Sequence, residues 1–402
     1  MGGATSRRGR HLIVLLHRWL ALVLGGWFVL AGLTGVALLW RDEIDRLLNP
    51  ALLEGATAGP RMPPERLPAL VQARYPGAMP EVIRMPGTDR AAYRVLLRTD
   101  GGRRIGARRV EASFDAVGGQ WLGERDPLER SLRPPALMAT VHDLHHRLLL
   151  GNAGKDVVAV AGLAMVVTIL AGLVLAVPRW RWASLRRALG LKLSAGTKRQ
   201  IYDAHRSAGL VCGGLLLVSA ATGVAMAWPE YARDLVGAAS PVRALPVVPW
   251  RPLARAPLAP TERGPDLARI VERSLAHRPG ASITEIHLGG SRDAPVLVYL
   301  HAAGDAHRLG DVRTLHRAAG GDLLLAVEPG SRTRGEGLLH WIVPLHAGTW
   351  LQGLGRPMMA LAGLLPAWML ATGLLVWRHK RAARRGLRAG APGARVARAT
   401  GL

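Results

Sequence analysis

Two histidines occupy matching positions in two similar apolar segments of this 402-residue chain. His17 and His205 are each followed by an arginine, an uncharged apolar run and a Thr-Gly pair, and the histidine-to-threonine spacing is 17 residues in both copies. Neutral imidazole is a common axial ligand of haem iron, and a six-coordinate iron takes one nitrogen on each face. We therefore consider this pair a candidate bis-histidine haem site.

Four apolar stretches free of charged residues must position these histidines. Each has about 20 residues, enough to cross a hydrocarbon core of about 30 Å. The first ends in Trp40-Arg41-Asp42 without a small-residue cleavage site, so we expect it to be retained and not removed as a signal peptide. The sequence therefore predicts a membrane protein with four transmembrane α-helices, at residues 20–40, 157–177, 207–228 and 357–377.

The basic residues predict the orientation of these helices. The stretches 1–18, 179–200 and 378–402 contain arginines and lysines but no acidic residue, which places them on the cytoplasmic side of a bacterial inner membrane. Four crossings then leave both termini in the cytoplasm. The net charge of +25 is explained by contact with anionic lipid headgroups, so it needs no nucleic acid. The C-terminal tail also lacks aromatic residues for base stacking.

A second histidine pair lies at the opposite, external helix ends. His146 and His346 each precede an apolar run by 10 residues, counted to Asp156 and Arg356, with glycines between. We expect each on a short interfacial helix, holding a second haem b between them. Electrons would pass from the cytoplasmic haem to the external one and then to an external acceptor. The pairing stays open, because other histidines lie nearby: His142, His145 and His340 outside, and His11 and His379 inside.

A simpler interpretation of these motifs is that they only anchor and pack the helices. A His-Arg pair at a membrane helix end often serves as an interfacial anchor. The threonines of the repeated motif, Thr34, Thr222 and Thr372, are expected to face lipid or to bond back to their own helix. The preceding glycine pairs allow close helix approach, and they could equally leave room for a porphyrin.

The chain repeats as two copies of helix, external module and helix. Both external segments contain one amphipathic helix (64–75 and 265–276) and strand-like pieces (92–98 and 108–114, then 282–288 and 296–301), which predicts two small α+β modules with modest cores. The predicted division is: 1–40, cytoplasmic N-terminus and first membrane helix; 41–140, first external module; 141–178, interfacial helix and second membrane helix; 179–204, cytoplasmic loop; 205–228, third membrane helix; 229–337, second external module; 338–377, interfacial helix and fourth membrane helix; 378–402, basic tail.

These motifs in combination resemble the PepSY-associated transmembrane helix family, also called PepSY-TM or iron-regulated membrane proteins. The resembling residues are His17-Arg18-Trp19, Thr34-Gly35, Trp40 to Ile44, Asn49-Pro50, His142 to Gly151, Asp203 to Arg206, Thr222-Gly223, Leu339-His340-Trp341, Pro344 to Gly348, and Thr372 to Leu375. The resemblance covers nearly the whole chain. It implies periplasmic PepSY-like modules between the helices. Some members of the family resemble inner-membrane reductases of ferric siderophores with b-type haems between their helices.

The leading functional hypothesis is therefore a haem protein that passes electrons across the membrane to periplasmic ferric chelates. Two alternatives stay open: a non-enzymatic PepSY scaffold or peptidase regulator, and a quinol-linked carrier to a periplasmic protein. No GxGxxG motif follows a strand, so no NAD or FAD site is evident and the unidentified electron donor is separate. The lone Cys212 excludes an internal disulfide and a CxxCH haem attachment. A metal site at His301, His307 and His316 is a weak possibility, because no ligand spacing supports it.

Overall fold

The computed structural model describes residues 7–55, 59–87, 91–99, 108–177, 181–192, 194–243, 265–289 and 294–389, with side chains up to residue 383. Within these residues, four helices are long and apolar enough to cross a membrane. Their mean hydropathies over the most apolar part are 2.1, 2.7, 2.0 and 1.9. They are α1 (Arg7–Leu39), α6 (Gly151–Ala176), α8 (Thr197–Ala227) and α12 (Gly355–Ala389). The predicted four membrane helices are confirmed.

The four helices form a bundle that turns apolar side chains outward. Val23, Val160, Val211 and Leu361, one from each helix, are more than half exposed, as side chains that face lipid must be. Helix α12 contacts α1 and α8, and α6 contacts the same two helices. The backbones of α1 and α12 approach closely at a glycine pair, because a Cβ on Gly32 would lie 2.1 Å from the carbonyl oxygen of Gly363.

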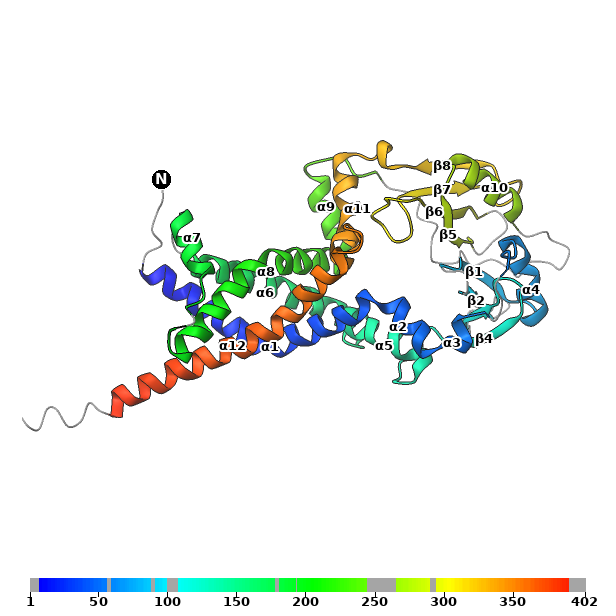
Figure 1. The fold of residues 1–402 in the computed structure, drawn as a ribbon. Coiled ribbons are helices and arrows are strands. Elements are labelled where there is room, and N and C mark those ends of the chain that lie inside the picture. The colour runs from blue at the N-terminus through cyan, green and yellow to red at the C-terminus, as the bar shows by residue number, and fades with distance from the viewer. Residues whose placement is uncertain are drawn as a thin grey trace, which may run out of the picture.

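Short helices extend the bundle at its two ends. One end carries α2 (Arg41–Leu48), α3 (Pro50–Leu53), α5 (Pro134–Arg147), α9 (Pro229–Gly237), the 3₁₀ turn η2 (Pro329–Ser331) and α11 (Arg334–Ala347). We call this the sheet end, because the β-sheet lies beyond it (Figure 1). The other end, called the far end, carries α7 (Trp182–Leu189). Arg179 and the tail beyond residue 389, which the orientation argument used, lie outside the described residues.

Helices α5 and α11 match the expected interfacial helices. Both end in left-handed residues, Leu148 and Leu149 after α5 and Gly348 after α11. A Cβ on Gly348 would lie 2.7 Å from the carbonyl oxygen of Gly355, so this turn needs glycine both for its φ of 68° and for space. These sharp turns let each short helix lead directly into a membrane helix.

The two external modules form one antiparallel sheet and not two separate sheets. Among the described residues its strand order is β4-β3-β2-β1-β5-β6-β7-β8. Strands β1 and β5 join the halves through the pairs Val82–His287, Ile83–Ile286 and Arg84–Glu285. The strands are β1 (Met79–Arg84), β2 (Tyr93–Arg98), β3 (Arg109–Phe114), β4 (Trp121–Arg125), β5 (Ser282–His287), β6 (Val296–His301), β7 (Val312–His316) and β8 (Leu323–Val327).

One hydrophobic core serves both halves of the sheet. Helix α4 (Leu67–Arg74), which follows the 3₁₀ turn η1 (Pro64–Arg66), and helix α10 (Leu267–His277) cover the face turned away from the bundle (Figure 1). Val71 and Ile270 from these helices pack with Ile83 and Ile286 of the central strands, and all four are fully buried. The shared core is larger than either expected module could build alone.

The opposite face of the sheet is polar and connects to the bundle. Arg84 contacts Glu111 at 2.6 Å and Glu285 at 3.1 Å, so it bridges the two halves. Arg125 contacts Glu111 at 2.6 Å and Asp45 of α2 at 2.9 Å. Burial alone would raise the pKa of Glu111, but Arg125, Arg94 and Arg84 outweigh it and bring the pKa to about 2. This ionic network connects the sheet to α2, the helix that follows α1.

Candidate functional site

At the far end of the bundle, His17 of α1 and His205 of α8 face each other. Their ring centroids are 6.4 Å apart and their planes are nearly perpendicular, at 81°. Both side chains are half-buried. The repeated histidines recognised in the sequence are therefore neighbours across the bundle.

A threonine of α12 orients His205. The Nδ1 atom of His205 lies 2.8 Å from Thr372 Oγ1, whose hydroxyl donates to the Trp368 carbonyl at 2.7 Å. Because this hydroxyl proton is already used, the oxygen accepts from Nδ1–H. This hydrogen-bond pattern assigns the tautomer whose Nε2 carries the lone pair, which is the form that binds a metal.

The other three histidines of interest are held in the same way. His17 Nδ1 lies 2.8 Å from the backbone oxygen of Thr168 in α6, which can only accept. At the sheet end, Thr34 Oγ1 lies 2.9 Å from His145 Nδ1, and Thr222 Oγ1 lies 3.1 Å from His346 Nδ1. Within the described residues, none of the four Nε2 atoms has a hydrogen-bond partner. Each of the four histidines thus uses Nδ1 within the protein and leaves Nε2 available.

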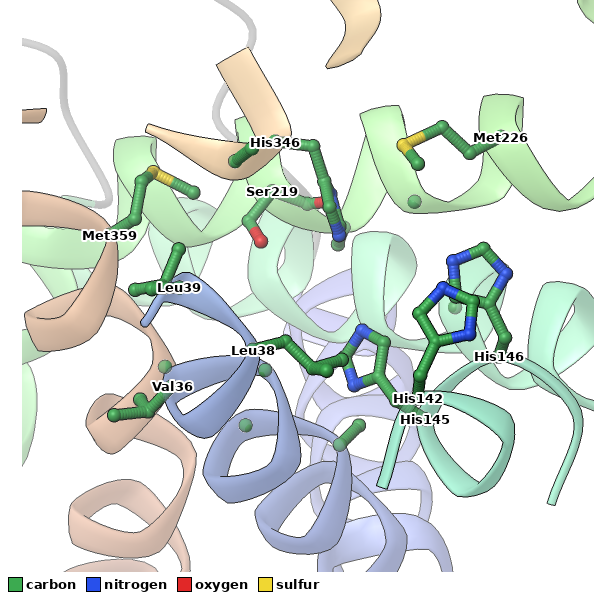
Figure 2. A pocket seen from close by; sticks show the side chains of 18 of the residues that line it. Val36, Leu38, Leu39, His142, His145, His146, Ser219, Met226, His346 and Met359 are labelled. Atoms are coloured by element: carbon green, nitrogen blue, oxygen red, sulfur yellow. The ribbon is translucent and has the colours of Figure 1, made fainter. Parts of the chain in front are cut away.

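His145 and His346 form the pair at the sheet end. They come from α5 and α11, and their ring centroids are 6.3 Å apart at an interplanar angle of 55°. Figure 2 shows the two rings on opposite sides of a pocket, with His142 and His146 beside His145. The two pairs therefore have almost the same spacing, although they lie at opposite ends of the bundle.

Glycines leave room for all four imidazoles. A Cβ on Gly172 would lie 3.0 Å from His17 Cε1, and one on Gly373 would lie 3.4 Å from His205 Cε1. At the sheet end, a Cβ on Gly35 or Gly223 would lie 3.2 Å from Cε1 of His145 or His346. Three of these glycines directly follow the threonines that hold a histidine ring. The Thr-Gly pair therefore has a specific role: threonine fixes Nδ1 and glycine admits the ring.

The spacing of each pair fits two axial ligands of one haem iron. A metal–imidazole nitrogen bond is about 2 Å long, so two rings on opposite faces of one metal have centroids roughly 6 Å apart. Both pairs match this value. Seventeen residues separate His17 from Thr34 and His205 from Thr222, so the two pairs are roughly 25 Å apart along the bundle. Each end of the bundle therefore has one histidine pair whose spacing fits a bis-histidine haem.

His145 and His346 both line a cavity of about 320 Å³. All four membrane helices contribute to its wall, including Trp27, Met165, Leu216 and Met359. Such a volume, an apolar wall and a few converging polar groups are typical of a cofactor or ligand site. The charged residues that line it are Arg41, Asp42, Glu43, Arg308 and Arg356. They lie at the starts of α2 and α12 and in the loop between β6 and β7, and we call this side of the cavity its mouth.

The remaining sequence candidates lie outside the two pairs. His146 stacks on His142, with centroids 4.6 Å apart, and both line the cavity beside His145. Sequence spacing selected His146 as the partner of His346, but the structure places His145 opposite His346. His340 contacts Asp311 at 2.8 Å and lies 5.6 Å from His307, away from His346. No contact in the described residues joins His11 or His379 to a histidine pair.

The proposed metal site in the second external module has no support from geometry. His316 is fully buried and contacts Ser274 Oγ at 2.9 Å and the Gly321 carbonyl at 3.1 Å, so it is a hydrogen-bonded core residue. His301 lies on β6, whereas His307 lies beside α11. Among the described residues, no group of three metal-binding side chains forms.

The sequence did not predict that three threonines contact the histidines. Thr34, Thr222 and Thr372 do bond back to their own helices, as expected for membrane threonines, but they are buried and do not face lipid. Their contact with histidine was the missed role. The constant 17-residue spacing to a Thr-Gly pair was the signal that could have revealed it.

Comparison with known proteins identifies one family. A model of the family described as the PepSY-associated TM region matches residues 14–380, which include all four histidines of the two pairs and both halves of the sheet. A search of the curated proteins found no match.

Proposed function

The chain belongs to the family of the PepSY-associated TM region, and from this premise we propose that it is a membrane electron-transfer protein with two haem b groups. His17 and His205 would hold one haem, and His145 and His346 the other. The observation that carries the proposal is the common geometry of the four histidines. Each uses Nδ1 in a hydrogen bond and leaves Nε2 free, and each pair has the ring spacing of a bis-histidine haem.

The chain's own residues prepare both sites. The threonines and the Thr168 carbonyl fix each imidazole before any ligand binds, which reduces the entropy lost on binding. Between the two pairs the bundle is apolar, and Phe28, Met165 and Ala220 pack together there. A bis-histidine haem iron takes up and releases a single electron when bound. Two such sites roughly 25 Å apart would give a route across most of the bilayer.

We further propose that the far end faces the cytoplasm and that the sheet end delivers electrons to a periplasmic ferric chelate. Basic residues around α7, such as Arg186, Arg187 and Lys192, support this orientation by the positive-inside rule. The cavity mouth at the sheet end, lined by arginines, is the side from which an acceptor would approach. The donor in this proposal is a quinol or a separate reductase, because no GxGxxG motif of a nicotinamide or flavin site follows a strand in this sequence.

The absorption spectrum of the purified full-length protein tests the proposal. We expect a Soret band, two haems per chain, and loss of about one haem in both His17→Ala and His346→Ala. His340→Ala is the matched control, because His340 shares α11 with His346 but contacts Asp311 instead. Reoxidation of the reduced protein by a ferric chelate then tests the acceptor. Colourless protein from cells supplied with iron and haem precursor would contradict the proposal and favour the alternative of a non-enzymatic scaffold.

A further inference from the structure

The mouth of the sheet-end cavity carries one more positive than negative charge. Three arginines and two carboxylates line it. Arg356 pairs with Glu43 at 2.6 Å, and Arg308, which reaches over from the loop between β6 and β7, pairs with Asp42. Within each pair the two charges neutralise each other. Arg41 is therefore the one charged residue of the mouth that has no ion-pair partner among the described residues.

Arg41 has no hydrogen bond or ion pair in the part of the chain that the structure describes. Burial lowers the pKa of Arg41, and the neighbouring Arg84 and Arg308 lower it further, against the opposing effects of Asp42 and Glu111. The neighbouring His142 supplies no charge at neutral pH, because burial, Arg41 and His146 bring its pKa to about 4. A partly buried guanidinium without a partner is costly unless an anion binds it.

The second copy of the repeat shows that this arginine is not a general feature of the helix end. Adding the 188-residue offset between His17 and His205 places Trp228 opposite Trp40 and Pro229 opposite Arg41. Each copy has a tryptophan directly after its membrane helix, Trp40 after α1 and Trp228 after α8, but only the first copy has the arginine. An interfacial anchor would serve both copies equally, whereas a ligand contact is needed only where the ligand lies.

We propose that Arg41 binds a carboxylate at the mouth of the sheet-end cavity. The planar guanidinium can donate two parallel hydrogen bonds to such a group. Arg41 follows Gly35 by six residues, and a Cβ on Gly35 would lie 3.2 Å from His145 Cε1. Arg41, Gly35 and His145 all line the same cavity. The carboxylate therefore belongs to a ligand that lies in the cavity or enters it.

Two sources supply this chemistry, and the inference rests on the proposed function for both. One is a propionate of the haem held by His145 and His346. The other is a ferric chelate whose chelator carries carboxylates, such as ferric citrate. In the first case Arg41 positions the haem, and in the second it selects the acceptor.

The test compares Arg41→Gln with Arg41→Lys and with Arg46→Gln in the full-length protein. Arg46→Gln removes the same charge from the same helix, but Arg46 does not line the cavity. Haem content and the midpoint potentials of both haems are measured first. Steady-state reduction of ferric citrate is then compared with that of a ferric trihydroxamate without carboxylates. The far-end haem in each sample reports on correct folding.

A propionate contact predicts that Arg41→Gln weakens haem binding at the sheet end roughly 10- to 100-fold and lowers only that midpoint potential. An acceptor contact predicts unchanged spectra and a similar rise in the KM for ferric citrate alone. In both cases Arg41→Lys should be intermediate and Arg46→Gln should resemble the wild type. The inference is overturned when Arg41→Gln and Arg46→Gln behave alike in every measurement. A wild-type protein without haem would instead contradict the proposed function.

Discussion

At the scale of single residues, the site depends on which imidazole nitrogen is already occupied. In all four histidines, Nδ1 forms a hydrogen bond within the protein and Nε2 is left available for a ligand. A carbonyl or a hydroxyl that already donates elsewhere makes this choice, so the tautomer is set before a ligand arrives. Hydrogen bonds to ligating histidines are worth 10- to 100-fold in affinity in other metal sites.

Thr34→Val should therefore weaken one haem and leave the other unchanged. Valine fills the same space but cannot accept from His145 Nδ1, so haem affinity at the sheet end should fall by roughly 10- to 100-fold. Thr372→Val should have the same effect on the far-end haem through His205. A redox titration that resolves both haems measures this. Equal effects of both variants on both haems would show that the threonines act only on general stability.

The glycines beside the rings predict a graded series of alanine variants. Gly172→Ala should disturb haem binding most, because its Cβ would lie 3.0 Å from His17 Cε1. Gly35→Ala, at 3.2 Å, should be weaker, and Gly373→Ala, at 3.4 Å, should be tolerated as an ordinary contact. Haem content per chain measures the order. Gly26→Ala is the control, since nothing lies within 4 Å of its Cβ, and a loss as large as that of Gly172→Ala would contradict the series.

The sequence predicted three of the four residues in the two facing pairs. It identified His17, His205 and His346 from spacing, but it selected His146 where His145 lies opposite His346. The choice depended on the rotation of α5 about its axis, which a count of residues to the next helix does not give. The two left-handed residues between α5 and α6, Leu148 and Leu149, were also not evident from the spacing. The threonine contacts were also hidden, because they join residues 111 to 167 positions apart.

At the scale of secondary structure, the sequence predicted individual strands but not how they pair. The period-2 pattern located β2, β3, β5 and β6 to within a residue or two. The pairing of β1 with β5 joins segments about 200 residues apart, and local patterns contain no information on such contacts. The result is one sheet with a shared core, in which Arg84 contacts glutamates from both halves.

The buried Glu111 makes the stability of this sheet depend on acid. Its folded pKa of about 2 lies below the ordinary 4.5, so the stabilisation is complete above pH 4.5 and disappears as pH falls toward 2. The shift corresponds to roughly 3 kcal/mol. Thermal unfolding of the detergent-solubilised protein should show a falling Tm across this window.

Glu111→Gln should lower the Tm at pH 7 and flatten the acid dependence. The loss at neutral pH follows because Arg84 and Arg125 remain buried without their shared partner. Glu65→Gln, which removes an exposed carboxylate, is the control and should retain the wild-type profile. An unchanged acid profile in Glu111→Gln would show that other carboxylates dominate acid unfolding.

At the scale of the whole molecule, the two ends of the bundle are chemically different. The sheet caps one end, whereas α7 and its arginines lie at the other (Figure 1). Helix α7 is held there by Arg206 and Ser207, which donate to the carbonyls of Arg187 and Ala188 beside the His17–His205 pair. The direction of electron flow in the proposed function depends on which end faces the cytoplasm.

Cysteine labelling tests this orientation directly. In a Cys212→Ser background, Ser282→Cys, at the exposed first residue of β5, should react with a membrane-impermeant maleimide in cells whose outer membrane is permeabilised. Ala183→Cys on exposed α7 should react only after the inner membrane is broken. The physical reason is that arginines near α7 resist translocation during insertion.

The labelling result decides the direction of the proposed relay independently of any haem measurement. If α7 is cytoplasmic, His17 and His205 lie on the side of the electron donor and Arg41 faces the acceptor. If Ala183→Cys is instead labelled from outside, the sheet and the Arg41 site face the cytoplasm, and delivery of electrons to a periplasmic chelate is excluded. The two bis-histidine sites would still be possible, because their geometry is set inside the bundle and does not depend on its orientation in the membrane.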